Sequence, residues 1–90
     1  MPERWTIRLS PQAARQLAGL PRDQQVLISR AINRMETDPF QGDVKPLQGR
    51  KWHGRYRKRV GRYRLIFIPQ HQAFVIEISA ILLRDEQTYR

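Results

Sequence analysis

Residues 55–67 read Arg-Tyr-Arg-Lys-Arg-Val-Gly-Arg-Tyr-Arg-Leu-Ile-Phe, and this stretch predicts a tight β-hairpin. Two strand-like runs, 55–60 and 63–69, flank Gly61-Arg62, and a two-residue turn that contains glycine is typical of a hairpin. Directly opposed residues on paired strands point to the same face of a sheet, so this turn places five apolar or aromatic side chains together. They are Tyr56, Val60, Tyr63, Leu65 and Phe67. We expect this face to cover the core, with Lys58 on the same side extending its ammonium group to an edge.

The opposite face of the hairpin collects arginines. They are Arg55, Arg57, Arg59 and Arg64, and Ile66 and Ile68 fall on the same side. Six of the 13 residues are basic and none is acidic, and the acid-free stretch extends from Val44 to Ile76. Like charges on short paired strands repel one another, so we expect a polyanion, most commonly a nucleic acid, as the partner of this face. The alternative is an ordinary solvated strand face whose basic residues prevent aggregation at a sheet edge.

The rest of the chain predicts two helices between the first strand and the hairpin. Ser10-Pro11 suits a helix start, because serine caps the free amide groups and proline lacks one. Pro21 begins a second helix, in which Leu27, Ala31 and Met35 recur on one apolar stripe. We expect strands over residues 5–9, 55–60, 63–69 and 73–81, helices over 11–19 and 21–37, and a loop over 40–54. This order, β-α-α-β-β-β, predicts an α+β fold with an antiparallel sheet and a helical hairpin packed on one face.

The composition describes one small domain over residues 1–90, without cysteine for a disulfide or a thiolate site. No apolar run approaches the roughly 20 residues of a membrane span, and the first residues lack the pattern of a secretion signal. We therefore expect a soluble, cytoplasmic protein that does not bind a membrane. His53 and His71 are isolated and lack the spacing of metal ligands, so we expect neither a metal nor a cofactor.

The net charge favours a phosphate-bearing partner. Formal charge is +9, from 17 basic and 8 acidic residues, and 14 of the basic residues are arginine. A guanidinium group grips phosphate with two hydrogen bonds and stacks on bases, whereas lysine acts as a point charge. Trp52 and Tyr56 lie beside the arginines in the sequence and are candidates for base stacking, although aromatic residues near strand starts more often belong to the core.

Three stretches carry a resemblance to a known family. They are Lys45-Pro46-Leu47-Gln48-Gly49, the hairpin from Tyr56 to Phe67, and the tail from Ile78-Ser79-Ala80 through Arg84 to Tyr89-Arg90. With the order of elements, they make nearly the whole chain resemble the RelE/ParE superfamily of toxin–antitoxin systems. The RelE-like branch, which the basic residues favour, implies a ribosome-dependent endoribonuclease that cleaves mRNA without a metal. In that reaction the 2′-hydroxyl of the RNA attacks the adjacent phosphate, and basic residues stabilise the developing charge.

The resemblance also implies a set of catalytic residues. Arg57 and Arg59 match the two basic positions before the turn, and Arg64 matches the phosphate-binding arginine of the next strand. Arg84 is similar to the basic residue after the last strand, and Tyr89 to the terminal tyrosine, which implies proton transfer or stacking. We further expect a separate set of basic residues to dock the RNA backbone of the ribosome, namely Lys51, Arg55 and Arg62.

The resemblance leaves alternatives for the general base and for the activity, and it implies one protein partner. Arginine stays protonated, so the general base would be Tyr89, His53 or a group of the ribosome. ParE-like relatives share the fold but poison DNA gyrase by binding, and a third alternative is a member that binds RNA without cleaving it. In each case we expect a cognate antitoxin, which presents an acidic amphipathic segment and forms a hetero-oligomer with the toxin.

Overall fold

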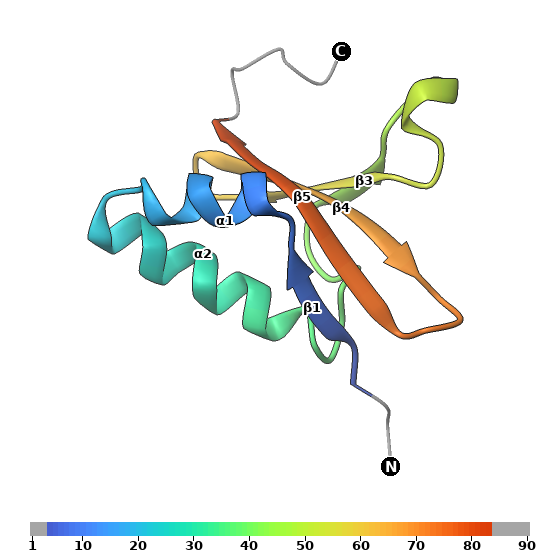
Figure 1. Ribbon diagram of the computed structural model, residues 1–90, viewed down its shortest axis with the longest axis horizontal. Coiled ribbons are helices and arrows are strands. Elements are labelled where there is room, and N and C mark those ends of the chain that lie inside the picture. The colour runs from blue at the N-terminus through green and yellow to red at the C-terminus, as the bar shows by residue number, and fades with distance from the viewer. Residues whose placement is uncertain (1–3, 84–90) are drawn as a thin grey trace.

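The computed structural model describes residues 4–83, which form two helices against one face of a five-stranded sheet (Figure 1). The strands lie in the order β1-β5-β4-β3-β2. The strands are β1 (Thr6–Leu9), β2 (Val44–Pro46), β3 (Tyr56–Val60), β4 (Tyr63–Gln70) and β5 (Val75–Leu83). The helices are α1 (Pro11–Ala18) and α2 (Arg22–Arg34), and a single 3-10 turn covers Arg50–Trp52. The predicted α+β class and the order of elements are confirmed.

The β3–β4 hairpin has the predicted register. Val60 pairs with Tyr63 and Tyr56 with Phe67, so the turn consists of Gly61 and Arg62. Gly61 has a φ of 57°, and a positive φ at the first central position matches a type II′ turn, where glycine is preferred. This turn shares the right-handed twist of the flanking strands and so fixes which side chains face the helices.

The core lies between the sheet and the helices. Ile28, Ala31 and Met35 from α2 or its end are at most 1% exposed, and Leu65 and Phe67 of β4 are completely buried beneath them. Ser10 caps α1, because its hydroxyl accepts a hydrogen bond from the amide of Ala13 at 3.1 Å. The same hydroxyl donates to the carbonyl of Ser79 at 3.0 Å, which ties the start of α1 to β5.

Two features of the sheet differ from the predicted arrangement. Strand β1 runs parallel to β5, with Ile7 opposite Ile76, so the sheet is mixed, while its other pairs are antiparallel. The alternating run over residues 5–9 predicts a strand but carries no signal for the direction of its partner. The second difference is β2, which lies within the segment predicted as a loop and pairs Val44 with Lys58 at the edge of the sheet.

Candidate functional site

The arginine cluster, which we define as Arg57, Arg59 and Arg64, lies on the face of the sheet opposite the helices. Side chains alternate along a strand, so the core positions Val60, Tyr63 and their neighbours leave these arginines on the other side. Arg59 lies directly opposite Arg64 across the β3–β4 pair. Two like charges at such a position repel each other, so this pair is stabilised by any anion that binds between them.

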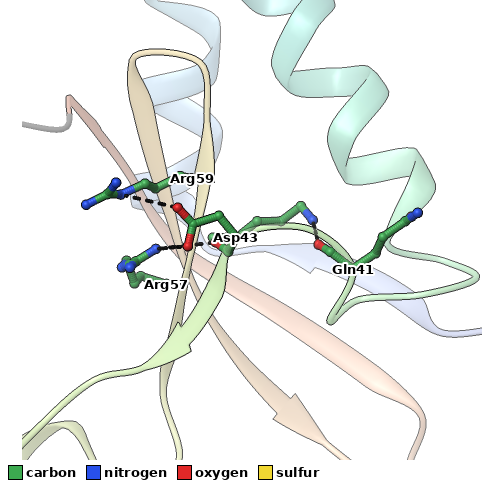
Figure 2. A network of polar contacts seen from close by, with 5 residues as sticks. Gln41, Asp43, Arg57 and Arg59 are labelled. Atoms are coloured by element: carbon green, nitrogen blue, oxygen red, sulfur yellow. Dashed lines mark hydrogen bonds and ion pairs between the residues drawn. The ribbon is translucent and has the colours of Figure 1, made fainter.

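The surroundings of the cluster contain an acid, which corrects the expectation of an acid-free face (Figure 2). Asp43 lies directly before β2, and its Oδ1 is 3.0 Å from Nη1 of Arg57, while its Oδ2 is 3.6 Å from Nε of Arg59. The backbone carbonyl of Asp43 also accepts hydrogen bonds from the amide of Arg59 at 3.0 Å and from Nη1 of Arg57 at 3.3 Å. One residue therefore partly neutralises two of the three arginines.

The members of the cluster differ in accessibility. Arg57 is only 9% exposed and lies opposite Ile66, which is also buried. Arg59 and Arg64 are half-buried. The hydrogen bond from Arg57, together with the charges of both arginines, lowers the pKa of the Asp43 carboxyl below its ordinary value of 3.8, so it is ionised at neutral pH.

Lys58 lies on the helical side of β3, as predicted, and its ammonium group reaches the edge. Its Nζ donates a hydrogen bond to the carbonyl of Gln41 (Figure 2). Burial, and then the charge of Arg34, lowers the pKa of Lys58 below its ordinary value of 10.5. Here α2 and β3 border a hollow of about 450 Å³, lined by Leu27, Ala31, Arg34, Gln41, Lys58 and Val60 among others.

The residues predicted to dock RNA fall at two ends of β3. Arg62 is exposed in the hairpin turn, at one end of β3. Lys51 and Arg55 lie at the other end, where Lys51 Nζ and Arg55 Cζ are each 5.5 Å from the centroid of the Trp52 ring. These distances permit cation–π contacts, so Trp52 orients two cations in the segment between β2 and β3. Arg55 directly precedes β3, and its side chain contacts Trp52.

The remaining predicted site residues are Arg84, Tyr89 and His53. Arg84 and Tyr89 lie outside the described residues. His53 is exposed beside Trp52 in the segment that precedes β3. Within residues 4–83, no three histidine or acidic side chains are grouped as metal ligands would be. No helix in that range is long and apolar enough to cross a membrane.

Asp43 is the residue of the site that sequence reasoning missed. It is 14 positions from Arg57 in the chain, and only the pairing of β2 with β3 brings the two together. The available signal was weak: Asp43 precedes a three-residue run, Val44–Pro46, that is shorter than a typical strand. A proline in that run is compatible with an edge strand, which is where β2 lies.

Comparisons with known proteins agree with this fold. The family model described as ParE toxin of type II toxin-antitoxin system, parDE, matches residues 7–88. The toxin–antitoxin complex RelBE2 from Mycobacterium tuberculosis contains a similar chain, with a TM-score of 0.80 and 23% identity, over 90% of this chain and 99% of that one. The archaeal RelE-RelB complex from Pyrococcus horikoshii gives a TM-score of 0.79 and 24% identity, over 93% and 99% of the two chains.

A third similar structure is the YoeB/ParE toxin from Agrobacterium tumefaciens, with a TM-score of 0.73 and 14% identity, over 88% of this chain and 98% of that one. At these identities the structural matches demonstrate a shared fold. No curated protein sequence matches the chain.

Proposed function

Because the chain belongs to the ParE toxin family of type II toxin–antitoxin systems, within the RelE/ParE superfamily, we propose that it is a toxin with the RelE-like activity of that superfamily. The proposed reaction is cleavage of mRNA on the ribosome in the cytoplasm. This proposal rests on the pair Arg59 and Arg64, which oppose each other across β3 and β4 on the face of the sheet opposite α1 and α2. Both occupy positions that resemble the phosphate-binding positions of RelE-like toxins.

The chemistry assigned to this pair is charge stabilisation. When the 2′-hydroxyl of an RNA nucleotide attacks the adjacent phosphate, negative charge builds on the phosphate oxygens. Two fixed guanidinium groups stabilise that charge more strongly than they stabilise the ground state, which lowers the barrier. Arginine does not accept a proton at neutral pH, so the base is a different group, and Tyr89, His53 or the ribosome are the candidates.

The test is induced expression followed by primer extension on a cellular mRNA. We expect new 5′ ends within codons soon after induction, and we expect Arg64→Ala to reduce their yield by at least about tenfold, since one lost charge donor commonly costs this much or more. Arg30→Ala is the matched control, because Arg30 is exposed on α2 in the helical layer. Growth arrest without new ends, or unchanged cleavage by Arg64→Ala, would contradict the nuclease proposal.

A second candidate function is inhibition of DNA gyrase by binding. Two observations favour it: the matching family model is that of ParE toxins, and Arg57 is buried and paired with Asp43 rather than open to RNA. In that case, induction should relax plasmid DNA while mRNA stays intact. Plasmid topology on chloroquine gels, taken from the same cultures as the primer extension, separates the two activities.

We also propose a cognate antitoxin as the partner of this chain. The similar structures from M. tuberculosis and P. horikoshii are complexes of a toxin with its antitoxin. A net charge of +9 favours an acidic antitoxin, whose amphipathic segment folds onto the basic sheet. Co-expression with the product of the adjacent open reading frame should yield a stable hetero-oligomer and restore growth. Failure of every adjacent product to bind would contradict this assignment.

A further inference from the structure

The carboxylate of Asp43 lies beside the arginine cluster, where an external anion would also bind. Its two carboxylate oxygens divide between two arginines, with Oδ1 at 3.0 Å from Arg57 and Oδ2 at 3.6 Å from Arg59 (Figure 2). The distance to Arg59 exceeds that of a hydrogen bond, and the buried Nε of Arg59 has no hydrogen-bond acceptor among the described residues. Arg59 is therefore attracted to Asp43 but is not saturated by it.

The contacts of Arg57 are of a different kind. Its Nη1 donates to both the carboxylate and the backbone carbonyl of Asp43, and its side chain is 11% exposed. These bonds fasten the start of β2 to β3, so Arg57 is a positioning residue for Asp43. Arg59 and Arg64 are each partly exposed and lie opposite each other across β3 and β4, so an external phosphate can approach both.

We propose that Asp43 is a built-in competitor of phosphate at this site: its carboxylate offsets the charge of Arg59, and an RNA phosphate binds between Arg59 and Arg64 against that competition. This inference rests on the proposed RNA-binding function and assigns Asp43 a role that limits affinity. The side chain of Asp43 is 44% exposed, so the carboxylate can rotate towards solvent when a phosphate arrives. An incoming phosphate is repelled by Asp43 until that movement occurs.

The variant Asp43→Asn tests the proposal, because asparagine keeps the shape and one oxygen acceptor while it removes the charge. We expect it to bind a fluorescein-labelled, mixed-sequence single-stranded RNA about fivefold more tightly than wild type at low ionic strength. The measurement is fluorescence anisotropy with purified protein, without ribosomes. Asp23→Asn is the control for net charge, because Asp23 lies in the first turn of α2 in the helical layer, and it should change affinity less than twofold.

A double-mutant cycle locates the effect. In an Arg59→Gln background, the gain from Asp43→Asn should be clearly smaller, because the arginine whose charge Asp43 offsets is missing and only the direct repulsion between Asp43 and the phosphate is relieved. Four outcomes would each overturn the inference. Two concern the size of the gain: equal gains in affinity from Asp43→Asn and Asp23→Asn, or an undiminished gain in the Arg59→Gln background. The other two are weaker RNA binding by Asp43→Asn and the absence of any RNA binding. Circular dichroism should confirm that each variant is folded. If the inference fails in this way, mRNA cleavage in cells can still be observed, so the two proposals fail separately.

Discussion

At the scale of single residues, Asp43 should make the stability of the protein depend on pH in the acidic range. Its pKa is lowered in the folded chain by the hydrogen bond from Arg57, so its contribution to stability is fully present above about pH 3.8 and is lost as the pH falls through the lower, folded value. We expect Asp43→Asn to melt below wild type at neutral pH, and the two melting temperatures to converge as the pH falls below 3.8 and the folded-state carboxylate takes up its proton. Thermal unfolding monitored by circular dichroism across this range checks it. A difference that stays constant with pH would show that the charge of Asp43 is not responsible.

Lys58 should make stability depend on pH at the alkaline end, and its charged form should destabilise the fold at neutral pH. Its pKa is lowered by burial, so the unfolded chain holds more protons than the folded chain between the folded value and 10.5, and stability rises with pH across that window. We expect Lys58→Met to stabilise the protein at neutral pH by less than about 1 kcal/mol, because the group is only partly buried and is screened by solvent. Gln41 is exposed, so its carbonyl can bond to water instead.

Urea unfolding at neutral and alkaline pH measures this effect. The gain from Lys58→Met should shrink as the pH rises towards 10.5, because wild-type Lys58 loses its proton in the folded state before it does so in the unfolded chain. Lys51→Met is the control, because Lys51 is exposed in the segment before β3. Destabilisation by Lys58→Met at both pH values would mean that the hydrogen bond to Gln41 outweighs the cost of burying the charge.

At the scale of elements, the hairpin was predictable and β2 was not. Tyr63, Leu65 and Phe67 all point to the core face of the sheet in the observed register. A shift of one residue would bury arginines in their place, so the sequence specifies the register. Strand β2 has three residues and no alternation that separates it from a loop. Because β2 delivers Asp43 to the cluster, the error in this element became an error about the charge of the site.

The turn between β3 and β4 should depend on Gly61. Its φ of 57° is costly for an L-residue with a side chain, and a Cβ there would lie 3.0 Å from Cδ2 of Leu27. We expect Gly61→Ala to reduce the free energy of unfolding by about 1–2 kcal/mol, mainly through the backbone conformation, since the leucine side chain can shift. Chemical denaturation measures the change.

Gly19→Ala is the matched control for that variant. Gly19 ends α1 with a φ of −84°, and its Cβ would lie at least 3.5 Å from its neighbours, so alanine fits there. We expect this change to be neutral or slightly stabilising, because alanine reduces the freedom of the unfolded chain. If Gly61→Ala is as well tolerated as Gly19→Ala, the turn does not require glycine.

At the scale of the whole molecule, the sheet order explains both what was predicted and what was not. The pattern of hydrophobic residues assigned the helices to one face, and the arginines therefore to the other, because one apolar face has to cover the core. The parallel contact of β1 with β5 joins residues such as Ile7 and Ile76, which are far apart in the chain, and no local pattern encodes such a pair. The approach of Asp43 to Arg59 has the same origin, on a smaller scale.

A 90-residue domain with a charge of +9 should gain much of its working stability from its antitoxin. Small domains bury little surface, and concentrated like charge opposes compaction, so an acidic partner that binds only the folded chain stabilises it by mass action. At an antitoxin concentration of about 100 times Kd, the gain is about 2.7 kcal/mol, which corresponds to a rise in melting temperature of at least about 10 °C for a domain of this size. Scanning fluorimetry of the toxin with increasing amounts of the adjacent open reading frame's product measures the shift.

Heparin, added at the same molar charge as the antitoxin, is the control for this experiment. It shows how much of the stabilisation comes from charge neutralisation alone and not from specific binding of the antitoxin. The antitoxin should still raise the melting temperature at about 0.5 M salt, where contacts between exposed charges are largely screened, whereas any effect of heparin should disappear. The shift should also keep growing with the logarithm of antitoxin concentration after the site is saturated, as linkage requires. If the rise in melting temperature caused by the antitoxin disappears at high salt, as that of heparin should, the complex is held by exposed charges alone. The apolar face of the antitoxin segment would then contribute nothing to binding.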